Sequence, residues 1–255
     1  MLTNLLIIAS VVFLYVSIGF ILAVYLKRND IADVMWGPGI FLSSLVAFLL
    51  VGGGPVLTLL IVFFWALRIS VHIGKRFLGK KEEDFRYATW RLEWKYFYLR
   101  SYVQVFLLQG FLMFLVSSSL VFVKIYDLQI NPVMYWVGTF VSIFALTFET
   151  IADNQLTNFL KQKTGGIMQT GLWKYSRHPN YFGEVTFWWG VFLITVPSLS
   201  SFIVNPIFLI SPIMITFLIL YVSGIPLLEK KYDSNLEFQE NKSKTNAFFP
   251  WFPKK

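Results

Sequence analysis

Seven apolar stretches dominate this chain, and each is long enough to cross a membrane as a helix. A hydrocarbon core about 30 Å thick needs roughly 20 consecutive apolar residues in a helix. Hydrophobic residues make up 56% of the sequence and charged residues only 14%, whereas about a quarter of the residues in soluble domains are charged. A transmembrane β-barrel would show shorter segments of alternating polarity. The sequence therefore predicts an all-α, polytopic transmembrane bundle.

Glycines, prolines and charges divide the apolar residues into predicted spans. The spans are about 2–26, 31–51, 56–73, 102–123, 133–152, 183–201 and 206–228. Stretch 2–26 lacks a basic region before it and a small-residue cleavage site, so we expect a retained helix and not a signal peptide.

Basic residues are concentrated in alternate connections between these spans. The connections 27–30, 74–101 and 153–182, with the tail after residue 228, contain 20 of the 22 Lys and Arg residues. Cytoplasmic loops collect Lys and Arg, so we predict that the N-terminus is outside and the C-terminus is cytoplasmic. The net charge of +8 is therefore interpreted as membrane topology and not as a nucleic-acid surface.

The connection 74–101 mixes Lys and Arg with aromatic residues, as membrane–water interfaces do. Trp90, Trp94 and Tyr98 recur at helical spacing, which predicts an amphipathic interfacial helix in contact with membrane lipids. No cysteine is present, which excludes disulfides and thiolate chemistry. With only His72 and His178 as imidazole ligands, we predict no metal site.

Ionisable residues near or within the spans are candidates for function, because a membrane tolerates them only where they face protein, water or a ligand. Trp65, Arg68 and His72 share one helix face. Glu149, Asp153 and Asn154 follow each other at the end of the predicted span 133–152, and Asp33 begins the span 31–51. The structural alternatives are charge pairing between spans, balance of the basic loop and anchoring at the interface.

The segment 165–184 combines a predicted helix start with many polar side chains. Pro179 suits the first position of a helix, because its missing N–H costs nothing there. Free backbone amides at that point attract anions, and Arg177 adds a donor suited to phosphate or carboxylate. Asn180, Tyr181 and Glu184 offer hydrogen bonds to ribose or amide groups. The structural alternative is an ordinary helix N-terminus beside lipid headgroups.

This segment carries a specific resemblance. GLWKYSRHPNYFGE at 171–184 and ETIADNQ at 149–155 resemble the membrane reductases of the steroid 5α-reductase family, in particular their bacterial, DUF1295-like members of uncharacterised substrate. Further matching pieces are DVMWG at 33–37, WALRISVH at 65–72, EDFRY at 83–87 and NAFFPWF at 246–252. The resemblance spans nearly the whole chain.

The resemblance implies a seven-helix enzyme that binds NADPH in a cytoplasm-facing cavity. It would reduce a carbon–carbon double bond conjugated to a ketone in a lipid or steroid-like substrate, as a 3-oxo-5α-steroid 4-dehydrogenase-like reductase acting on a CH–CH group. The chain is expected to be one membrane domain, with residues 1–123 on the substrate side and 133–255 binding the cofactor. The resemblance to bacterial members favours the bacterial inner membrane over the endoplasmic reticulum. The sequence specifies neither the lipid nor the oligomeric state.

Cofactor-binding residues are predicted in the second half of the chain. By resemblance, Asp153, Asn180 and Glu184 fall on family positions that bind the cofactor, and Glu149 occupies a position where relatives can carry Asn. The complete predicted set is Glu149, Asp153, Asn154, Tyr175, Arg177, His178, Asn180, Tyr181, Glu184, Glu229 and Lys230.

Catalytic residues are predicted in the first half. Hydride transfer to an enone places negative charge on the ketone oxygen, which needs a donor or a proton. Steroid reductases use a Tyr on helix three and a Glu on helix two, whereas this chain has Trp65, Arg68 and His72 on the first and Asp33 on the second. Our hypothesis is that Arg68 or His72 polarises the substrate carbonyl, with Asp33 as the acidic group.

Two other functions stay open. The RHPNY piece also resembles membrane methyltransferases of the isoprenylcysteine and phospholipid type, which use S-adenosylmethionine. Those enzymes pair the motif with an Arg before an acidic pair after the last helix, whereas GIPLLEKKY at 224–232 has Glu229 without that Arg. The third possibility is a lipid-binding or assembly factor without chemistry, which should bind neither cofactor.

Overall fold

The computed structural model describes residues 2–50, 52, 56–125, 130–162, 165–196 and 206–254. Within these residues six helical segments are long and apolar enough to cross a membrane. They are Leu2–Leu26, Ile31–Leu50, Val56–Gly79, Phe97–Val116, Pro132–Lys161 and Ile207–Lys231. The predicted all-α, polytopic bundle is confirmed, and the chain is an integral membrane protein.

The remaining predicted span, 183–201, corresponds to α9 (Pro179–Thr195), which has 17 residues. Residues 197–205 of this region, and the turn residues 53–55, lie outside the described part of the chain. Two helices continue beyond their predicted ends: α3 (Val56–Gly79) passes residue 73, and α8 (Pro132–Lys161) passes residue 152. Since charged residues such as Arg76 and Asp153 do not interrupt a helix, the apolar pattern underestimated both lengths.

The chain forms two compact units, each described by itself. The first comprises Met1–Ile130 and Thr195–Ser211, and the second comprises Asn131–Ile194 and Pro212–Lys255. The roles predicted for residues 1–123 and 133–255 stay predictions.

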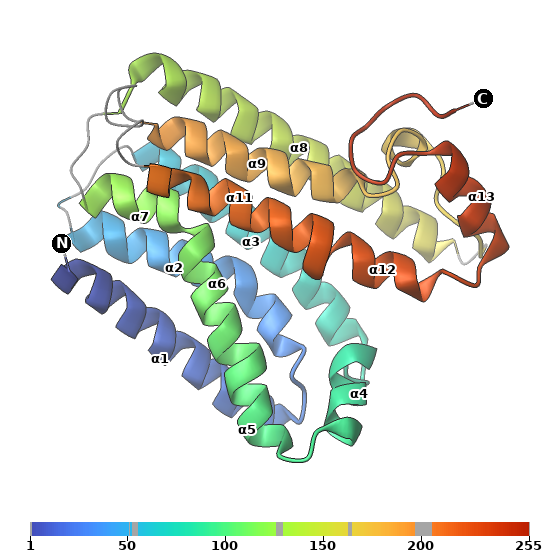
Figure 1. The fold of residues 1–255 in the computed structure, drawn as a ribbon, viewed down its shortest axis with the longest axis horizontal. Coiled ribbons are helices and arrows are strands. Elements are labelled where there is room, and N and C mark those ends of the chain that lie inside the picture. Colours follow the sequence, from blue (N-terminus) through green and yellow to red (C-terminus); the bar gives the residue numbers. More distant parts are fainter. Residues whose placement is uncertain are drawn as a thin grey trace. The chain divides into compact units, whose positions relative to one another are not determined.

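In the first unit, α2 (Ile31–Leu50) packs against both α1 (Leu2–Leu26) and α3 (Figure 1). The buried residues of α1 recur every three or four positions and form one face: Ile8, Val12, Val16, Gly19 and Ala23. Gly37 of α2 approaches α3 so closely that an added Cβ would lie 2.8 Å from the carbonyl oxygen of Ala66. Small residues allow such close packing between membrane helices.

The predicted span 102–123 is divided into several pieces. It begins in α5 (Phe97–Ser101), continues as a π-helical turn η1 (Tyr102–Leu107) and α6 (Leu108–Val116), and turns at Ser117 into α7 (Ser118–Ile125). The Ser117 hydroxyl donates to the carbonyl of Phe114 at 2.9 Å. The Ser119 hydroxyl donates to the carbonyl of Phe208 in η3 (Pro206–Leu209) at 3.1 Å. Serine side chains compete for backbone groups in this way, which explains the break.

The interfacial helix predicted through Trp90, Trp94 and Tyr98 is wrong as a single helix. Helix α4 (Phe85–Glu93) ends at Trp94, whose backbone is extended. Asp84 caps the other end, where its carboxylate accepts from the backbone amide of Arg86. The rings of Trp90 and Trp94 nevertheless stack, with centroids 5.0 Å apart.

In the second unit, α8 and α9 pack closely through small residues (Figure 1). An added Cβ on Gly138 would lie 2.4 Å from the backbone nitrogen of Ile194, and one on Gly190 would lie 2.5 Å from the hydroxyl oxygen of Ser142. An added Cβ on Gly183 would lie 2.6 Å from the Cβ of Glu149. The residue numbers of the contacts increase along α8 while those of their partners decrease along α9, so the two helices are antiparallel.

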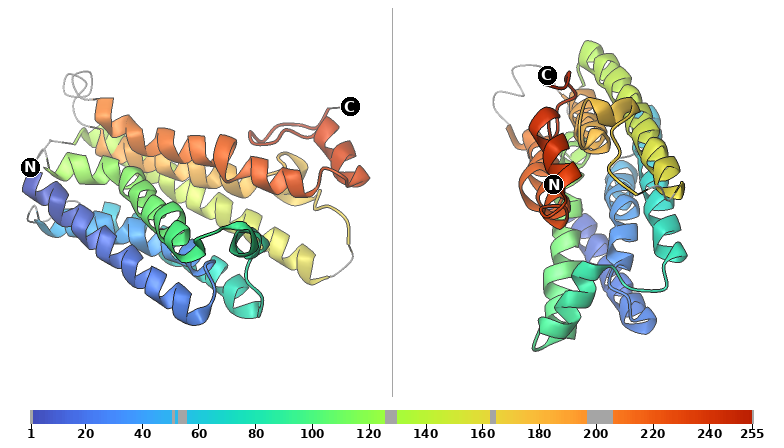
Figure 2. Two further views of the ribbon diagram at one scale, coloured as in Figure 1. Left: turned by 60° about the horizontal axis from the view of Figure 1, so that its bottom comes forward. Right: turned by 90° about the vertical axis from the view of Figure 1, so that its right-hand side faces the viewer.

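The last apolar segment of the chain is also divided. It consists of α11 (Ile210–Phe217), a π-helical turn η4 (Leu218–Val222) and α12 (Ile225–Lys231), and it is followed by α13 (Leu236–Lys244). Figure 2 shows that the C-terminal segment of this unit returns to the residues that precede α9.

Candidate functional site

The segment that leads into α9 is fixed to α8 by hydrogen bonds. Gly171 has a positive φ of 61°, and its backbone lies so close to Gln155 that an added Cβ would be 2.6 Å from the side-chain amide. The backbone amide of Leu172 donates to the Gln155 carbonyl oxygen at 3.0 Å. The Trp173 indole donates to the carbonyl of Ala152 at 3.0 Å. Helix α9 then begins at Pro179, as the sequence predicted.

The C-terminal residues 246–254, which we call the strap, lie along the same segment. The backbone amide of Arg177 donates to the carbonyl of Asn246 at 2.9 Å, and that of His178 donates to the carbonyl of Ala247 at 3.1 Å. In the other direction, the backbone amide of Trp251 donates to the carbonyl of Tyr175 at 2.8 Å. The strap therefore pairs with the RHPNY motif through main-chain bonds.

Arg177, His178 and Glu229 form a buried ionic cluster beneath the strap. Glu229 Oε1 accepts from Arg177 Nε at 2.9 Å and lies 2.8 Å from Arg177 Nη2. His178 Nε2 lies 3.1 Å from the same oxygen. The Nη1 atom of Arg177 donates to the carbonyls of Lys242 and Thr245. The Arg177 guanidinium is thus engaged by protein groups on three of its nitrogens, and in this arrangement it holds α12 and α13 in place.

Three further carboxylates of the predicted cofactor set are buried along α8 and α9. Glu149, Asp153 and Glu184 are 3%, 6% and 8% exposed. Glu149 contacts Gly183, and Asp153 lies one turn further along α8, so the antiparallel register places it level with the start of α9. Asn180 shares a face of α9 with Glu184, and its side-chain oxygen is buried without a hydrogen-bond partner among the described residues.

The other members of the predicted cofactor set are more accessible. Tyr181 is half-buried and stacks on the His178 ring, with centroids 5.5 Å apart. Tyr175 is half-buried and contacts the strap through Phe252. Asn154 and Lys230 are exposed. The structure therefore brings most of the predicted set to one end of the second unit and turns Asn154 away from the buried face.

In the first unit, the predicted catalytic residues of α3 form the expected stripe. Trp65 is fully buried, and Arg68 and His72 are half-buried. Arg76 continues the same stripe one turn later. The sequence reasoning did not single out Arg76, which lines the small pocket described below.

Asp33 at the start of α2 is held by two residues of α4. Its Oδ2 accepts from Arg86 Nη2 at 2.7 Å, and its Oδ1 accepts from the Tyr87 hydroxyl at 2.7 Å. Burial and the neighbouring Asp33 carboxylate raise the pKa of the Tyr87 phenol well above its usual value of 10.0. Arg86 also bonds Asp84 at 2.9 Å. Burial is the largest single influence on the pKa of Asp84 and would raise it, but the hydrogen bonds and charge of Arg86, together with the charge of Arg76, outweigh burial and lower that pKa.

Arg86 and Tyr87 were not among the predicted site residues. The signal was present, because both belong to the EDFRY piece at 83–87. Their contact with α2 depends on how the connection folds back after α3, which periodicity does not predict.

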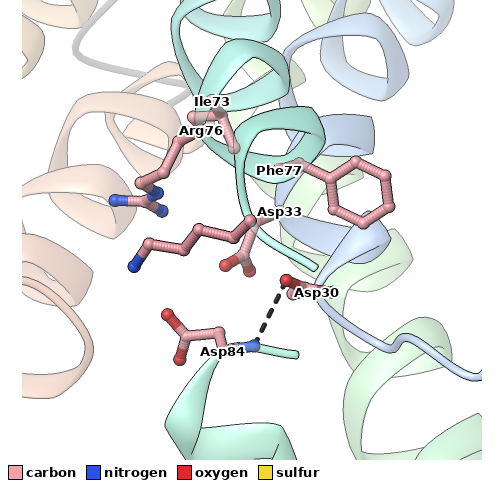
Figure 3. Close-up of a pocket in the computed structure, with 7 residues that line it drawn as sticks. Asp30, Asp33, Ile73, Arg76, Phe77 and Asp84 are labelled. Carbon is pink, nitrogen blue, oxygen red and sulfur yellow. Dashed lines mark hydrogen bonds between the residues drawn. The ribbon is translucent and has the colours of Figure 1, made fainter. Parts of the chain in front are cut away.

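A small pocket opens beside Asp33 (Figure 3). It encloses about 290 Å³, including the part open to solvent. The lining residues are Asp30, Asp33, Ile73, Arg76, Phe77, Lys80 and Asp84. In Figure 3, Arg76 and the carboxylates of Asp33 and Asp84 point toward the same opening. Because that volume includes open solvent, the enclosed part is small, and the pocket suits a small polar group and not a whole dinucleotide.

Within the described ranges, no three His, Asp or Glu side chains are grouped as metal ligands would be. A protein-family model described as "Protein of unknown function (DUF1295)" matches residues 19–245. No curated protein and no solved structure matches the chain.

Proposed function

We propose, because the chain belongs to the DUF1295 family, that it is an NADPH-dependent membrane oxidoreductase. The proposed reaction reduces a carbon–carbon double bond conjugated to a ketone in a lipid or steroid-like substrate. The observation that carries the proposal is the end of the second unit, where the resemblance to steroid 5α-reductase-like enzymes is strongest. Buried acceptors from α8 and α9 gather there beside the RHPNY motif.

The residues present fit the neutral parts of the cofactor. A buried carboxamide oxygen without a partner, as at Asn180, costs free energy unless a donor satisfies it. Ribose hydroxyls and the nicotinamide amide are such donors, and Asp153 and Glu184 offer further acceptors on the same faces. Arg177 is already engaged by Glu229, so we assign it to positioning α12 and the strap. Lys230 is exposed, so we assign the cofactor phosphate to Lys230 instead of Arg177.

When bound, NADPH supplies a hydride to the double bond. The protein's own task is to stabilise the negative charge on the ketone oxygen. Arg68 and His72 on α3 are the proposed donors, as the sequence indicated. The Tyr87 phenol, which is neutral at physiological pH and bonds Asp33, is an additional proton source in the same unit. We propose that Tyr87 of α4 and Asp33 of α2 take the place of the Tyr and Glu that steroid reductases carry on helices three and two.

A binding titration tests the proposal directly. Purified protein is titrated with NADPH, and nicotinamide fluorescence is followed, with S-adenosylmethionine as the parallel titrant. We expect saturable NADPH binding that Asn180→Ala and Glu184→Ala weaken, while both variants still insert and fold. Normal affinity in both variants would remove these residues from the cofactor site. Arg68→Ala and His72→Ala should slow enone-dependent NADPH consumption without loss of binding.

One observation favours the methyltransferase as a second candidate. The acidic residue after the last apolar segment, Glu229, contacts both Arg177 and His178 of the RHPNY motif. The methyltransferases that carry this motif also pair it with acidic residues at that place. Binding of S-adenosylmethionine without NADPH would select this function, and binding of neither would select a scaffold without chemistry.

We further propose that the C-terminus and the candidate site face the cytoplasm of a bacterial inner membrane. The distribution of Lys and Arg supports this orientation. The cytoplasm also supplies reduced nicotinamide cofactor, which an enzyme of this kind consumes.

A further inference from the structure

The pocket beside Asp33 contains charges that the proposed reaction does not use. Its walls come from the start of α2, the last turns of α3 and the connection that leads to α4 (Figure 3). These helix ends define the membrane–water boundary of the first unit, since α2 and α3 both qualify as membrane spans. The pocket therefore lies at the level of lipid headgroups.

The carboxylates of the pocket are held in fixed positions by arginines. Asp30 forms a bidentate pair with Arg28, at 3.1 and 2.7 Å. Arg86 bonds both Asp33 and Asp84. Only Oδ1 of Asp84 is used in these bonds, and Oδ2 makes no hydrogen bond within the described ranges. The pocket thus presents one free acceptor on a rigid wall.

Arg76 and Lys80 line the same pocket as these carboxylates but form no ion pair with them among the described residues. Both residues line the pocket and are exposed, and among the described residues neither side chain forms an ion pair within 4.0 Å. The three pocket carboxylates are bonded to Arg28 and Arg86, so Arg76 and Lys80 are the lining cations that can meet a ligand's negative charge. A ligand that carries one negative charge and also a hydrogen-bond donor would contact these two cations and reach Asp84.

Exposed apolar side chains lie close in sequence to the pocket residues. Leu78, on the last turn of α3, is 82% exposed, and Phe85, next to Asp84, is 56% exposed. Large apolar side chains at a helix end that enters the membrane contact lipid and not water. An amphiphile is therefore favoured over a soluble anion.

We propose that this pocket binds the headgroup of a phospholipid with a single anionic phosphodiester and hydroxyl donors, as in phosphatidylglycerol. The phosphodiester contacts Arg76 and Lys80, and a glycerol hydroxyl donates to Asp84 Oδ2. Arginine and lysine are the side chains that proteins use for phosphate. The inference does not depend on the proposed reductase activity, because the ligand is different and the proposed contacts, Arg76, Lys80 and Asp84, have no role in that reaction.

The test is a binding measurement on the delipidated full chain in neutral detergent. Short-chain phosphatidylglycerol is titrated in one arm, and phosphatidylcholine with the same acyl chains in the second. Glycerol 3-phosphate is the third arm and inorganic phosphate the fourth. We expect saturable binding of phosphatidylglycerol alone. If glycerol 3-phosphate binds as tightly as the lipid, the site belongs to a soluble phosphate compound and the lipid assignment is overturned.

A pair of double variants separates the pocket from general surface charge. Arg76→Gln with Lys80→Gln removes the two pocket cations, whereas Lys75→Gln with Lys81→Gln removes two neighbours that do not line it. Each double variant lowers the net charge of the protein by two, so the two variants carry equal charge. We expect the first to weaken phosphatidylglycerol binding roughly tenfold or more, since each tenfold corresponds to about 1.4 kcal/mol, and the second to leave it unchanged. Equal weakening in both would show an unspecific charge effect and overturn the proposal.

NADPH affinity of the same variants is the last readout. We expect it to be unchanged when Arg76 and Lys80 are replaced. A loss of NADPH binding with the first double variant would assign the pocket to the cofactor and overturn the lipid site, whereas wild-type protein that binds no NADPH would defeat the reductase proposal alone. Thermal unfolding in detergent identifies any variant that fails to fold, and Lys80→Gln alone then serves as the milder replacement.

Discussion

Replacing Gly183 by alanine should separate α8 from α9 and destabilise the second unit. An added Cβ at this position would lie 2.6 Å from the Glu149 Cβ and 2.9 Å from its Cα. Contacts below 3.0 Å essentially never occur for a real Cβ, and the α8 backbone cannot rotate away as a flexible side chain would. One of the two helices must therefore shift.

The magnitude follows from two opposing effects. Inserting a methyl group into a packed core typically costs about 1–3 kcal/mol. Alanine gains up to about 1 kcal/mol over glycine in a helix interior. Gly74→Ala on α3 provides a matched control, because its Cβ would meet only Val34 at 3.9 Å, an ordinary contact. Both variants share the helix gain, so Gly183→Ala should be less stable than Gly74→Ala by about 1–3 kcal/mol.

Reversible unfolding in mixed micelles, followed by tryptophan fluorescence, measures this difference. We expect Gly74→Ala to match or exceed the wild type and Gly183→Ala to unfold at a lower denaturant fraction. Because Glu149 is the residue displaced, NADPH affinity should fall in Gly183→Ala as well, if the proposed function holds. Equal free energies of unfolding for the two variants would refute the close packing on which the α8–α9 register depends.

Three further outcomes are expected. Glu229→Gln leaves the buried Arg177 without its countercharge, which costs up to about 3–5 kcal/mol, so amide hydrogen exchange in the strap should become faster. Glu240→Gln breaks only an exposed pair and should leave this exchange rate unchanged. Slow exchange in both variants would show that the ionic cluster does not hold the strap. Tyr87→Phe should lose about 1.5–3 kcal/mol at neutral pH, as expected for a hydrogen bond to a charged group. The folded-state pKa of Tyr87 is raised, so its contribution to the free energy of unfolding is present below the unfolded value of 10.0 and is lost as pH rises through the folded value. Above pH 10.0 the wild type should therefore lose stability more steeply than the variant. Parallel stability curves against pH would contradict this. In the cysteine-free chain, Val56→Cys should react with an impermeant maleimide in intact cells and Glu82→Cys only after permeabilisation, and the reverse pattern would invert the proposed orientation.

The apolar pattern predicted the bundle because a membrane imposes one strong rule, that a span must be apolar and helical. It did not predict helix ends. Helix α8 runs to Lys161 because polar residues past the hydrocarbon core continue a helix as easily as they begin a loop. The break at Ser117 depends on hydroxyl bonds to carbonyls, which are visible only once neighbouring segments are placed.

The sequence predicted the local features of the candidate site, but not which distant residues contact one another. The start of α9 at Pro179 followed from local backbone chemistry, and the shared face of Trp65, Arg68 and His72 followed from helical spacing. The engagement of Arg177 by Glu229 joins residues that are 52 positions apart, and that of Asp33 by Tyr87 joins residues 54 apart. Pairings at such separation require the tertiary fold.

The segment Thr195–Ser211 has a consequence for biogenesis. It belongs to the first unit, although it follows most of the second in the chain, and the Ser211 hydroxyl donates to the carbonyl of Val116 there. During translation, the Val116 carbonyl at the Ser117 turn therefore lacks its partner until 95 further residues have been synthesised. The start of α11 thus completes a unit that the N-terminal helices began.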